Sequence, residues 1–560
     1  MKFINRTQEL ARLNRLACKS AGGVAVVWGR RRVGKTRLLL EWVEQHGGIY
    51  FTADESAPAI QRKYFAAALG GALPGFSEVE YPDWGAFFSR LVKEAKHARF
   101  RGPIVIDELP YLISVSPELP SILQKFIDHD AKKAKLILAL CGSSQRMMQG
   151  AILDSSAPLF GRADELIKLK PIAAGYLKEA LKLKKPREII ETYAVWGGIP
   201  RYWELVEKNH GAFLEIIDRL VLDPMGPLHE EPTRLLLEES PSAINLRPIL
   251  DAIGLKNHRL SDVAARIGKP ATSLTRALQS LIELDLIHKE LPFGVDELNS
   301  KRTLYKISDP FVRFWFEMVA PRRSIFSQST QAVRIACLKE ALSAIVAAAW
   351  EELCRAAAPA LLTKWYGGIY QPAARFWQAR GFEWDLLTQS LDGSQLIIGE
   401  AKWTAKAPST TWVNHTLKEL KHRFLVRGAL SFGPIIHGSS VPAAAFQQPN
   451  GVALNIANNA TYLSSILIGL PMVQSHETER KAPPFGIYIH ESARAFSPPN
   501  VPPLHFRWWK WGSRFNSVCW PRMGVEIDDY FTRCMDNRYS IEYEKEKIEV
   551  HREMARQYFA

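Results

Sequence analysis

The sequence predicts an α/β protein, and three observations support that class. A short apolar run at residues 24–28 leads into a Gly-rich basic turn and then into a helical pattern. Two further apolar runs, at residues 103–107 and 135–141, end in charged or small polar residues, as buried strands do. Strand-like runs at 382–387 and 396–403 flank an Asp-Gly turn, which favours a hairpin. At roughly 150 residues per domain, the 560 residues correspond to three or four domains.

The composition is that of a globular protein able to bury substantial cores. Hydrophobic residues make up 47% of the chain and charged residues 23%, which excludes the disordered and collagen-like classes. Lys and Arg number 72 against 58 Asp and Glu. The resulting net charge of +14 favours polyanionic partners such as nucleic acid or acidic lipid headgroups.

The cysteines and the N-terminal stretch favour a cytoplasmic protein. The six cysteines are scattered without a C-x-x-C pair, so neither a zinc ribbon nor a disulfide framework is expected. The first residues carry charges where a signal peptide needs an apolar run, and no uninterrupted apolar stretch reaches about 18 residues. We therefore expect a protein of the reducing cytoplasm that does not cross a membrane.

The turn after residue 28 fits a phosphate-binding loop. Gly29, Gly34, Lys35 and Thr36 satisfy G-x-x-x-x-G-K-[ST], between a predicted strand and a predicted helix. Glycines let backbone N–H groups wrap a phosphate, while Lys35 reaches the β- and γ-oxygens and Thr36 binds Mg²⁺. ATP is therefore expected to contact the whole loop, namely Gly29, Arg30, Arg31, Arg32, Val33, Gly34, Lys35 and Thr36.

The two following apolar runs supply the other groups that ATP hydrolysis needs. Asp107 ends the first run and is predicted to hold the Mg²⁺ shell, with Glu108 as the general base that orients water. A hydroxyl after the next run, at Ser143, is placed to sense the γ-phosphate. Arg162 lies in a turn beyond it, where it either stabilises charge on the transferred phosphoryl group, from the same or a neighbouring subunit, or is a solvated arginine.

Six sequence blocks in order resemble the archaeal branch of the AAA+/STAND P-loop ATPases, over about residues 1–230. The blocks are FINRTQEL, WGRRRVGKTRLL, VIDELPYL, LCGSSQRMM, PLFGRADEL and YAVWGGIPRYWE. The resemblance implies a P-loop NTPase αβα core at 1–170 and a helical lid at 171–235. It also implies that Ser143 or Ser144 is in the sensor-1 position and that Arg162 is an arginine finger.

Residues 236–320 are predicted to form a winged helix-turn-helix. A short helix ending at Gly268, a longer helix over 270–287 and two strand-like runs follow one another. In a DNA-binding interpretation the longer helix enters the major groove, and Lys301 and Arg302 of the wing contact the backbone. In the alternative interpretation, the segment extends the lid or contacts protein.

Residues 321–465 carry two carboxylates and a lysine that the hairpin brings together. Glu400 and Lys402 are two positions apart and share a strand face, with Asp385 alongside. Asp385 and Glu400 can hold Mg²⁺, while Lys402 positions the nucleophile and offsets charge on a scissile phosphate. The pattern resembles the PD-(D/E)xK nuclease motif, which implies a restriction-endonuclease-like α/β domain, preceded by a helix with Glu351. An inactive nuclease-like fold and a merely exposed charged hairpin are the alternatives.

Residues 466–560 form an unassigned tail. A proline-rich stretch precedes residues 505–511, where aromatic residues alternate with cations. Such a run either stacks on bases and binds phosphates or is covered by its own domain.

Together these patterns predict an ATP- and Mg²⁺-dependent ATPase whose cycle drives a winged-helix and nuclease-like module on DNA or RNA. One alternative is a STAND-like switch, in which the nucleotide controls assembly and the nuclease-like domain is inactive. Another is a DNA-binding regulator that uses ATP only to fold. A homo-oligomer is also among the expectations.

Overall fold

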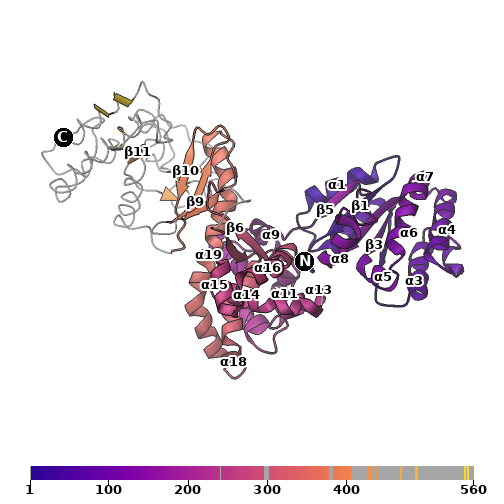
Figure 1. The fold of residues 1–560 in the computed structure, drawn as a ribbon, viewed down its shortest axis with the longest axis horizontal. Coiled ribbons are helices and arrows are strands. Elements are labelled where there is room, and N and C mark those ends of the chain that lie inside the picture. Colours follow the sequence, from indigo (N-terminus) through magenta and orange to yellow (C-terminus); the bar gives the residue numbers. More distant parts are fainter. Residues whose placement is uncertain are drawn as a thin grey trace, which may run out of the picture. The chain divides into compact units, whose positions relative to one another are not determined.

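The computed structural model describes residues 2–239, 241–295, 302–377 and 383–404, together with short segments beyond residue 426 (Figure 1). The chain divides into two compact units, residues 1–404 and 405–560. Lys301 of the predicted wing and the aromatic and cationic run at 505–511 lie outside the described residues. None of the described helices is both long enough and apolar enough to cross a membrane.

The first unit begins with a parallel five-stranded sheet in the order β2-β3-β4-β1-β5. Its strands are β1 (Gly23–Trp28), β2 (Ile49–Thr52), β3 (Pro103–Asp107), β4 (Ile137–Gly142) and β5 (Glu165–Lys168). The α/β class expected from the sequence is therefore confirmed. Strands β3 and β4 are buried along their whole length, because helices cover both faces of the sheet.

Alternate residues of β1 point into two different cores. Ala25 and Val27 join a cluster with the inner faces of α1 (Thr7–Ala17) and α2 (Lys35–His46). Val24 and Val26 join the opposite cluster, which contains the aromatic side chains of α3 (Pro58–Gly70) and α4 (Trp84–His97). The remaining helices of this part are α5 (Leu109–Val115), α6 (Leu119–Lys125), α7 (Lys132–Ala134) and α8 (Gln145–Met148). The result is a three-layer αβα arrangement.

The core under α1 and α2 continues into a helical region. Its helices are α9 (Leu177–Ala180), α10 (Pro186–Trp196), α11 (Pro200–Lys208), α12 (Phe213–Ile217), α13 (Glu231–Glu239) and α14 (Arg247–Gly254). Trp196 and Tyr202 belong to the same hydrophobic cluster as Val27, and the Phe311 ring stacks on Trp196 and packs at a tilt against Tyr202. The sheet and these helices therefore share one continuous core.

Two helices and a hairpin lie where the winged helix-turn-helix is predicted. They are α15 (Leu260–Ile267), α16 (Ala271–Glu283), β6 (Ile287–Glu290) and β7 (Leu304–Ile307), and the two strands pair antiparallel. The longer helix ends at Glu283 and not at residue 287, because Asp285 adopts a φ of 54° that a right-handed helix excludes. Whether this segment acts as a winged helix stays a prediction.

A long helix and a small sheet complete the first unit. After α17 (Pro310–Phe314) and α18 (Arg323–Phe326), α19 (Gln331–Tyr366) runs for 36 residues. The sheet has the order β10-β9-β8 and is antiparallel, with β8 (Ala374–Trp377), β9 (Glu383–Gln389) and β10 (Leu396–Gly399). Ala358 and Leu362 of α19 pack on Tyr370, which holds the sheet to the helix.

In the second unit, the described residues include two pairs of strands. β11 (Arg427–Leu430) is parallel to β14 (Gly486–Ile489), and β12 (Ile436–His437) is antiparallel to β13 (Leu467–Ile468).

Candidate nucleotide-binding site

The loop between β1 and α2 has a backbone that only glycine fits at two positions. Gly29 has a φ of 143°, and a Cβ there would lie 2.5 Å from the carbonyl oxygen of Leu169. Gly34 has a φ of 98° and caps α2 in a left-handed conformation. The loop therefore curls tightly at the N-terminus of a 12-residue helix, where unpaired N–H groups favour an anion.

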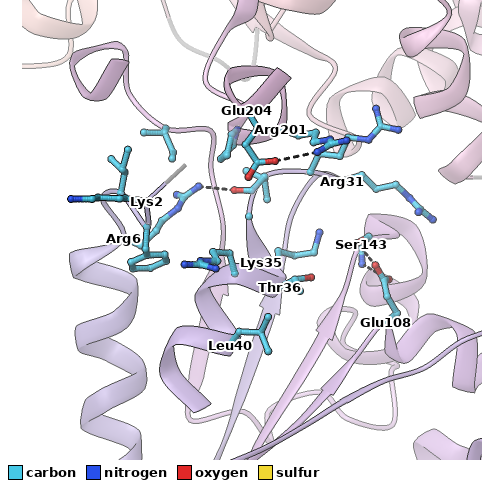
Figure 2. Close-up of a pocket in the computed structure, with 18 of the residues that line it drawn as sticks. Lys2, Arg6, Arg31, Lys35, Thr36, Leu40, Glu108, Ser143, Arg201 and Glu204 are labelled. Atoms are coloured by element: carbon cyan, nitrogen blue, oxygen red, sulfur yellow. Dashed lines mark hydrogen bonds and ion pairs between the residues drawn. The ribbon is translucent and has the colours of Figure 1, made fainter. Parts of the chain in front are cut away.

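A pocket of about 570 Å³ opens over this loop (Figure 2). Cationic side chains predominate in its lining: Lys2, Arg6, Arg31, Arg32, Lys35, Arg37 and Arg201. The three acidic residues are Glu108, Glu204 and Glu238, and the apolar ones are Phe3, Ile4, Val33, Leu40, Ile172 and Pro200. A pocket with a cationic part and an apolar part suits a ligand that joins a polyanion to an apolar ring.

The loop lysine binds the loop itself. Lys35 is almost fully buried, and its Nζ donates to the carbonyl oxygens of Gly29 at 2.8 Å and Arg30 at 3.1 Å. Burial lowers the pKa of Lys35 from its ordinary value. The ammonium group is therefore held at the centre of the loop, next to the pocket that Lys35 also lines.

Three donors converge on the carboxylate of Asp107. Thr36 Oγ1 donates to its Oδ2 at 2.9 Å, the Tyr50 hydroxyl donates to the same oxygen, and the backbone N–H of Glu108 donates to Oδ1 at 2.9 Å. Thr36 and Asp107 are hard oxygen ligands of the kind that Mg²⁺ prefers, so these residues fit the ion. In the described parts of the chain, no group of three or more His, Cys, Asp or Glu is arranged to hold a metal. A Mg²⁺ site does not need one, because water and phosphate oxygens supply the remaining ligands.

Glu108 is bound to the end of the neighbouring strand. Its carboxylate accepts from the Ser143 backbone N–H at 3.1 Å and from Ser143 Oγ at 2.5 Å, and both residues line the pocket (Figure 2). Glu108 has a φ of 54°, a conformation that costs a non-glycine residue energy and recurs at functional sites. The structure thus brings together Thr36 at the start of α2 with Asp107, Glu108 and Ser143 at the ends of the adjacent strands β3 and β4.

The three arginines of the loop are paired with carboxylates from distant parts of the chain. Arg30 lies 2.9 Å from Asp309, and Arg31 Nε lies 3.4 Å from Glu238. Arg32 binds Glu231 at the start of α13 and lies 3.7 Å from Glu238. We predicted the arginines as nucleotide ligands but not their acidic partners, because nothing in the local sequence connects residues this far apart.

Two family models match the chain. One, described as an ATPase domain predominantly from Archaea, matches residues 3–206. The other, described as archaeal and bacterial proteins of unknown function, matches residues 315–413. An uncharacterized protein of Methanocaldococcus jannaschii is 31% identical over 326 residues, which are 58% of this chain and 71% of that protein. The chain belongs to this archaeal ATPase family.

Two solved structures also resemble this chain. A Walker-type ATPase of Pyrococcus abyssi is 22% identical, with a TM-score of 0.45, over 56% of this chain and 96% of that one. Cdc6p of Pyrobaculum aerophilum is 15% identical, with a TM-score of 0.30, over 61% of this chain and 96% of that one. Both likenesses are weak, so the family assignment rests on the sequence matches.

Arg162 lies away from the pocket. Its guanidinium makes an ion pair with Asp128 at 3.0 Å and donates to the carbonyl oxygen of Phe160 at 3.0 Å. Arg162 is not one of the described residues that line the pocket. The arginine-finger role implied by the resemblance therefore stays a prediction.

The carboxylates and lysine of the third segment lie together at the end of the β9–β10 hairpin. Lys402 Nζ lies 2.8 Å from Glu400 Oε2 and 3.3 Å from Asp385 Oδ2. The backbone N–H of Ala401 donates to Asp385 Oδ2 at 2.9 Å, and buried Arg355 donates to the Asp385 carbonyl at 2.8 Å. Since β10 ends at Gly399, Glu400 and Lys402 follow the strand and are brought together by this contact with Asp385.

Glu351 of α19 faces the same cluster. Burial, and then the charge of Asp385, raise the pKa of Glu351, and burial also raises the pKa of Glu400. Lys402 offsets this crowding of negative charge. Within the described residues, these carboxylates do not form a group of three or more that is arranged to hold a metal ion. A metal role for Asp385 and Glu400 therefore stays a prediction.

Proposed function

We propose that this protein is a Mg²⁺-dependent ATPase whose nucleotide site controls the segments from α13 to the β9–β10 hairpin. The observation that carries the proposal is the convergence of Lys35, Thr36, Asp107 and Glu108 beside a cationic pocket. Phosphoryl transfer needs positioning and charge stabilisation more than covalent chemistry, and these residues supply both.

Lys35 and Thr36 bind the polyphosphate in this mechanism. Lys35 exchanges the carbonyl oxygens of Gly29 and Arg30 for the β- and γ-phosphate oxygens, which are stronger acceptors because they are charged. Thr36 and Asp107 would hold Mg²⁺. The ion, when bound, neutralises charge on the β- and γ-phosphates.

Glu108 is the general base of the proposal, and Ser143 controls it. A base must be within hydrogen-bond reach of the attacking water, whereas Glu108 here accepts two hydrogen bonds from Ser143. Ser143 also lines the pocket, so its hydroxyl can donate to a γ-phosphate oxygen in place of Glu108. We infer that the triphosphate draws Ser143 away and releases Glu108 to orient water.

The arginine pairs connect the nucleotide site to the rest of the first unit. Arg30 is buried and does not line the pocket, and its pair with Asp309 joins the loop to the start of α17. Phosphates compete with Glu231 and Glu238 for the guanidinium groups of Arg31 and Arg32, which line the pocket. Nucleotide binding therefore changes the contacts of α13, which precedes the helices and hairpin of residues 260–307. In the main form of the proposal, this movement drives a winged-helix and nuclease-like module on DNA or RNA, in line with the net charge of +14.

A second candidate function is an ATP-dependent switch with an inactive nuclease-like domain. Lys402 pairs with both Asp385 and Glu400 and so neutralises the negative charges that would otherwise attract a metal ion. The switch requires the same arginine pairs but no nucleic acid. It predicts a large change of assembly state with a slowly hydrolysed ATP analogue and no DNA binding.

ATP turnover with and without DNA tests the proposal on three variants. We expect Lys35→Ala to abolish nucleotide binding, because its ammonium group is the cation that the loop carbonyls of Gly29 and Arg30 hold in place. Lys63→Ala on the exposed face of α3 should bind normally. Glu108→Gln should bind ATP but not turn it over. Unchanged binding and turnover in Lys35→Ala would overturn the proposal. Stimulation by DNA would favour the nucleic-acid form, and an ATP-dependent shift in size-exclusion chromatography without DNA binding would favour the switch.

A further inference from the structure

Tyr50 belongs to none of the nucleotide-binding motifs, yet it contacts their central carboxylate. It lies on β2, the edge strand next to β3, and the two strands pair so that Tyr50 is opposite Val105 and Thr52 opposite Asp107. From this position the Tyr50 hydroxyl donates to Oδ2 of Asp107. Its ring is half-buried against the core under α1 and α2. The neighbouring strand thus adds a polar group to the metal side of the pocket.

The contact adds a donor to those that orient the Asp107 carboxylate. Oδ1 of Asp107 is held by the N–H of the next residue, and Oδ2 is shared by Thr36 and Tyr50. The Glu108 N–H belongs to the residue next to Asp107 in the backbone, and the Thr36 hydroxyl must point its oxygen at Mg²⁺ when the ion binds. The Tyr50 hydroxyl has neither constraint, so its role on Oδ2 is to orient the carboxylate.

In this contact the Tyr50 hydroxyl is the donor and the Asp107 carboxylate oxygen is the acceptor.

We propose that Tyr50 is a positioning residue that orients Asp107 towards the Mg²⁺ of the nucleotide complex. The inference rests on the proposed ATPase function. Groups that hydrogen-bond to a metal-binding side chain fix its orientation, and their loss typically costs about 10- to 100-fold in metal affinity or activity. A hydroxyl that acts on Asp107 should sit at the lower end of that range. It should affect the Mg²⁺-dependent part of ATP binding and not the part that the loop provides alone.

Tyr50→Phe removes only the hydroxyl and leaves the ring in its half-buried place. The experiment measures binding of a fluorescent ATP analogue to the full chain, first in EDTA and then during a Mg²⁺ titration at fixed nucleotide. We expect the affinity in EDTA to equal that of wild type, and the Mg²⁺ concentration for half-saturation to rise by about tenfold. An unchanged or lowered half-saturation would overturn the inference. So would an equal loss in both arms, since that is what a purely structural role produces.

Two further variants sharpen the test. Tyr64→Phe removes a hydroxyl from a tyrosine that is 51% exposed, and it should behave as wild type in both arms. In an Asp107→Asn background, Tyr50→Phe should add no further loss, because the group it orients has already been altered. A further loss there would place the hydroxyl's action elsewhere and overturn the inference. If wild type itself binds no nucleotide, the proposed function fails; if wild type binds with Mg²⁺ and Tyr50→Phe matches it, this inference alone fails.

Discussion

Arg30, the second residue of the phosphate loop, makes an ion pair with Asp309, which lies 279 positions further along the chain. The atoms are 2.9 Å apart, and only 7% of the Arg30 side chain and 1% of the Asp309 side chain are exposed. Asp309 also accepts from the N–H of Val312 at 2.9 Å and so caps α17. One carboxylate therefore serves both the nucleotide loop and the helix that follows the β6–β7 hairpin.

Breaking this pair on one side should be costly. Asp309→Asn leaves the Arg30 charge buried without its counter-charge, and we expect the free energy of unfolding to fall by about 3–5 kcal/mol. Replacing both members, as Arg30→Met with Asp309→Asn, should recover part of that loss because no unpaired charge remains. Urea unfolding of the two single variants and the double variant measures the coupling. Losses that simply add would show that the pair contributes nothing specific.

Glu238 should oppose nucleotide binding. It lines the pocket, lies near Arg31 and Arg32, and puts a negative charge where the polyphosphate is expected. Its side chain is 32% exposed, so the interaction is partly screened and worth about 0.2–1 kcal/mol. We therefore expect Glu238→Gln to tighten ATP binding by a factor of at most about five. Isothermal titration calorimetry checks this, with Glu179→Gln on the exposed side of α9 as the control. Weaker binding by Glu238→Gln would mean that the carboxylate helps to hold the nucleotide.

How far the sequence predicts the site depends on whether its residues are local. Lys35, Asp107 and Ser143 could be named as candidates because each is close to the end of a strand that has a clear apolar run, and parallel strands bring their ends together. Tyr50 was missed because β2 is only four residues long and shows no pattern of its own. The partners of the loop arginines were missed for a different reason: their positions are set by how the helices pack and not by spacing. The end of α16 before the predicted residue 287 depends on the left-handed backbone of Asp285, which the spacing of apolar residues does not reveal.

Arg162 should act on a neighbouring subunit's nucleotide if the arginine-finger prediction holds. Arg162→Ala should then reduce turnover by a factor on the order of 10³. A mixture of Arg162→Ala and Glu108→Gln should regain part of the activity, since mixed assemblies contain sites with an intact base and an intact arginine. Arg99→Ala, which removes an exposed arginine after α4, is the control. Full activity of Arg162→Ala would assign the residue to its ion pair with Asp128 alone.

Lys402 should stabilise the fold near neutral pH and matter little in acid. Burial raises the folded-state pKa of Glu400 above its ordinary 4.5, so the folded chain holds its proton more tightly than the unfolded chain does. Stability linked to Glu400 is therefore present at pH values below 4.5 and is lost as the pH rises through the folded-state pKa.

Removing the Lys402 ammonium group makes this loss of stability at higher pH larger, because Asp385 and Glu400 then face each other without a counter-charge. We expect Lys402→Met to match wild type near pH 4, where Glu400 holds its proton, and to be less stable at pH 7 by about 1 kcal/mol, since Lys402 is 52% exposed. Thermal unfolding across that pH range measures the difference, with Lys364→Met on the exposed face of α19 as the control. A loss of equal size at every pH would instead indicate that the lysine contributes through its aliphatic stem, because contacts of that kind do not titrate.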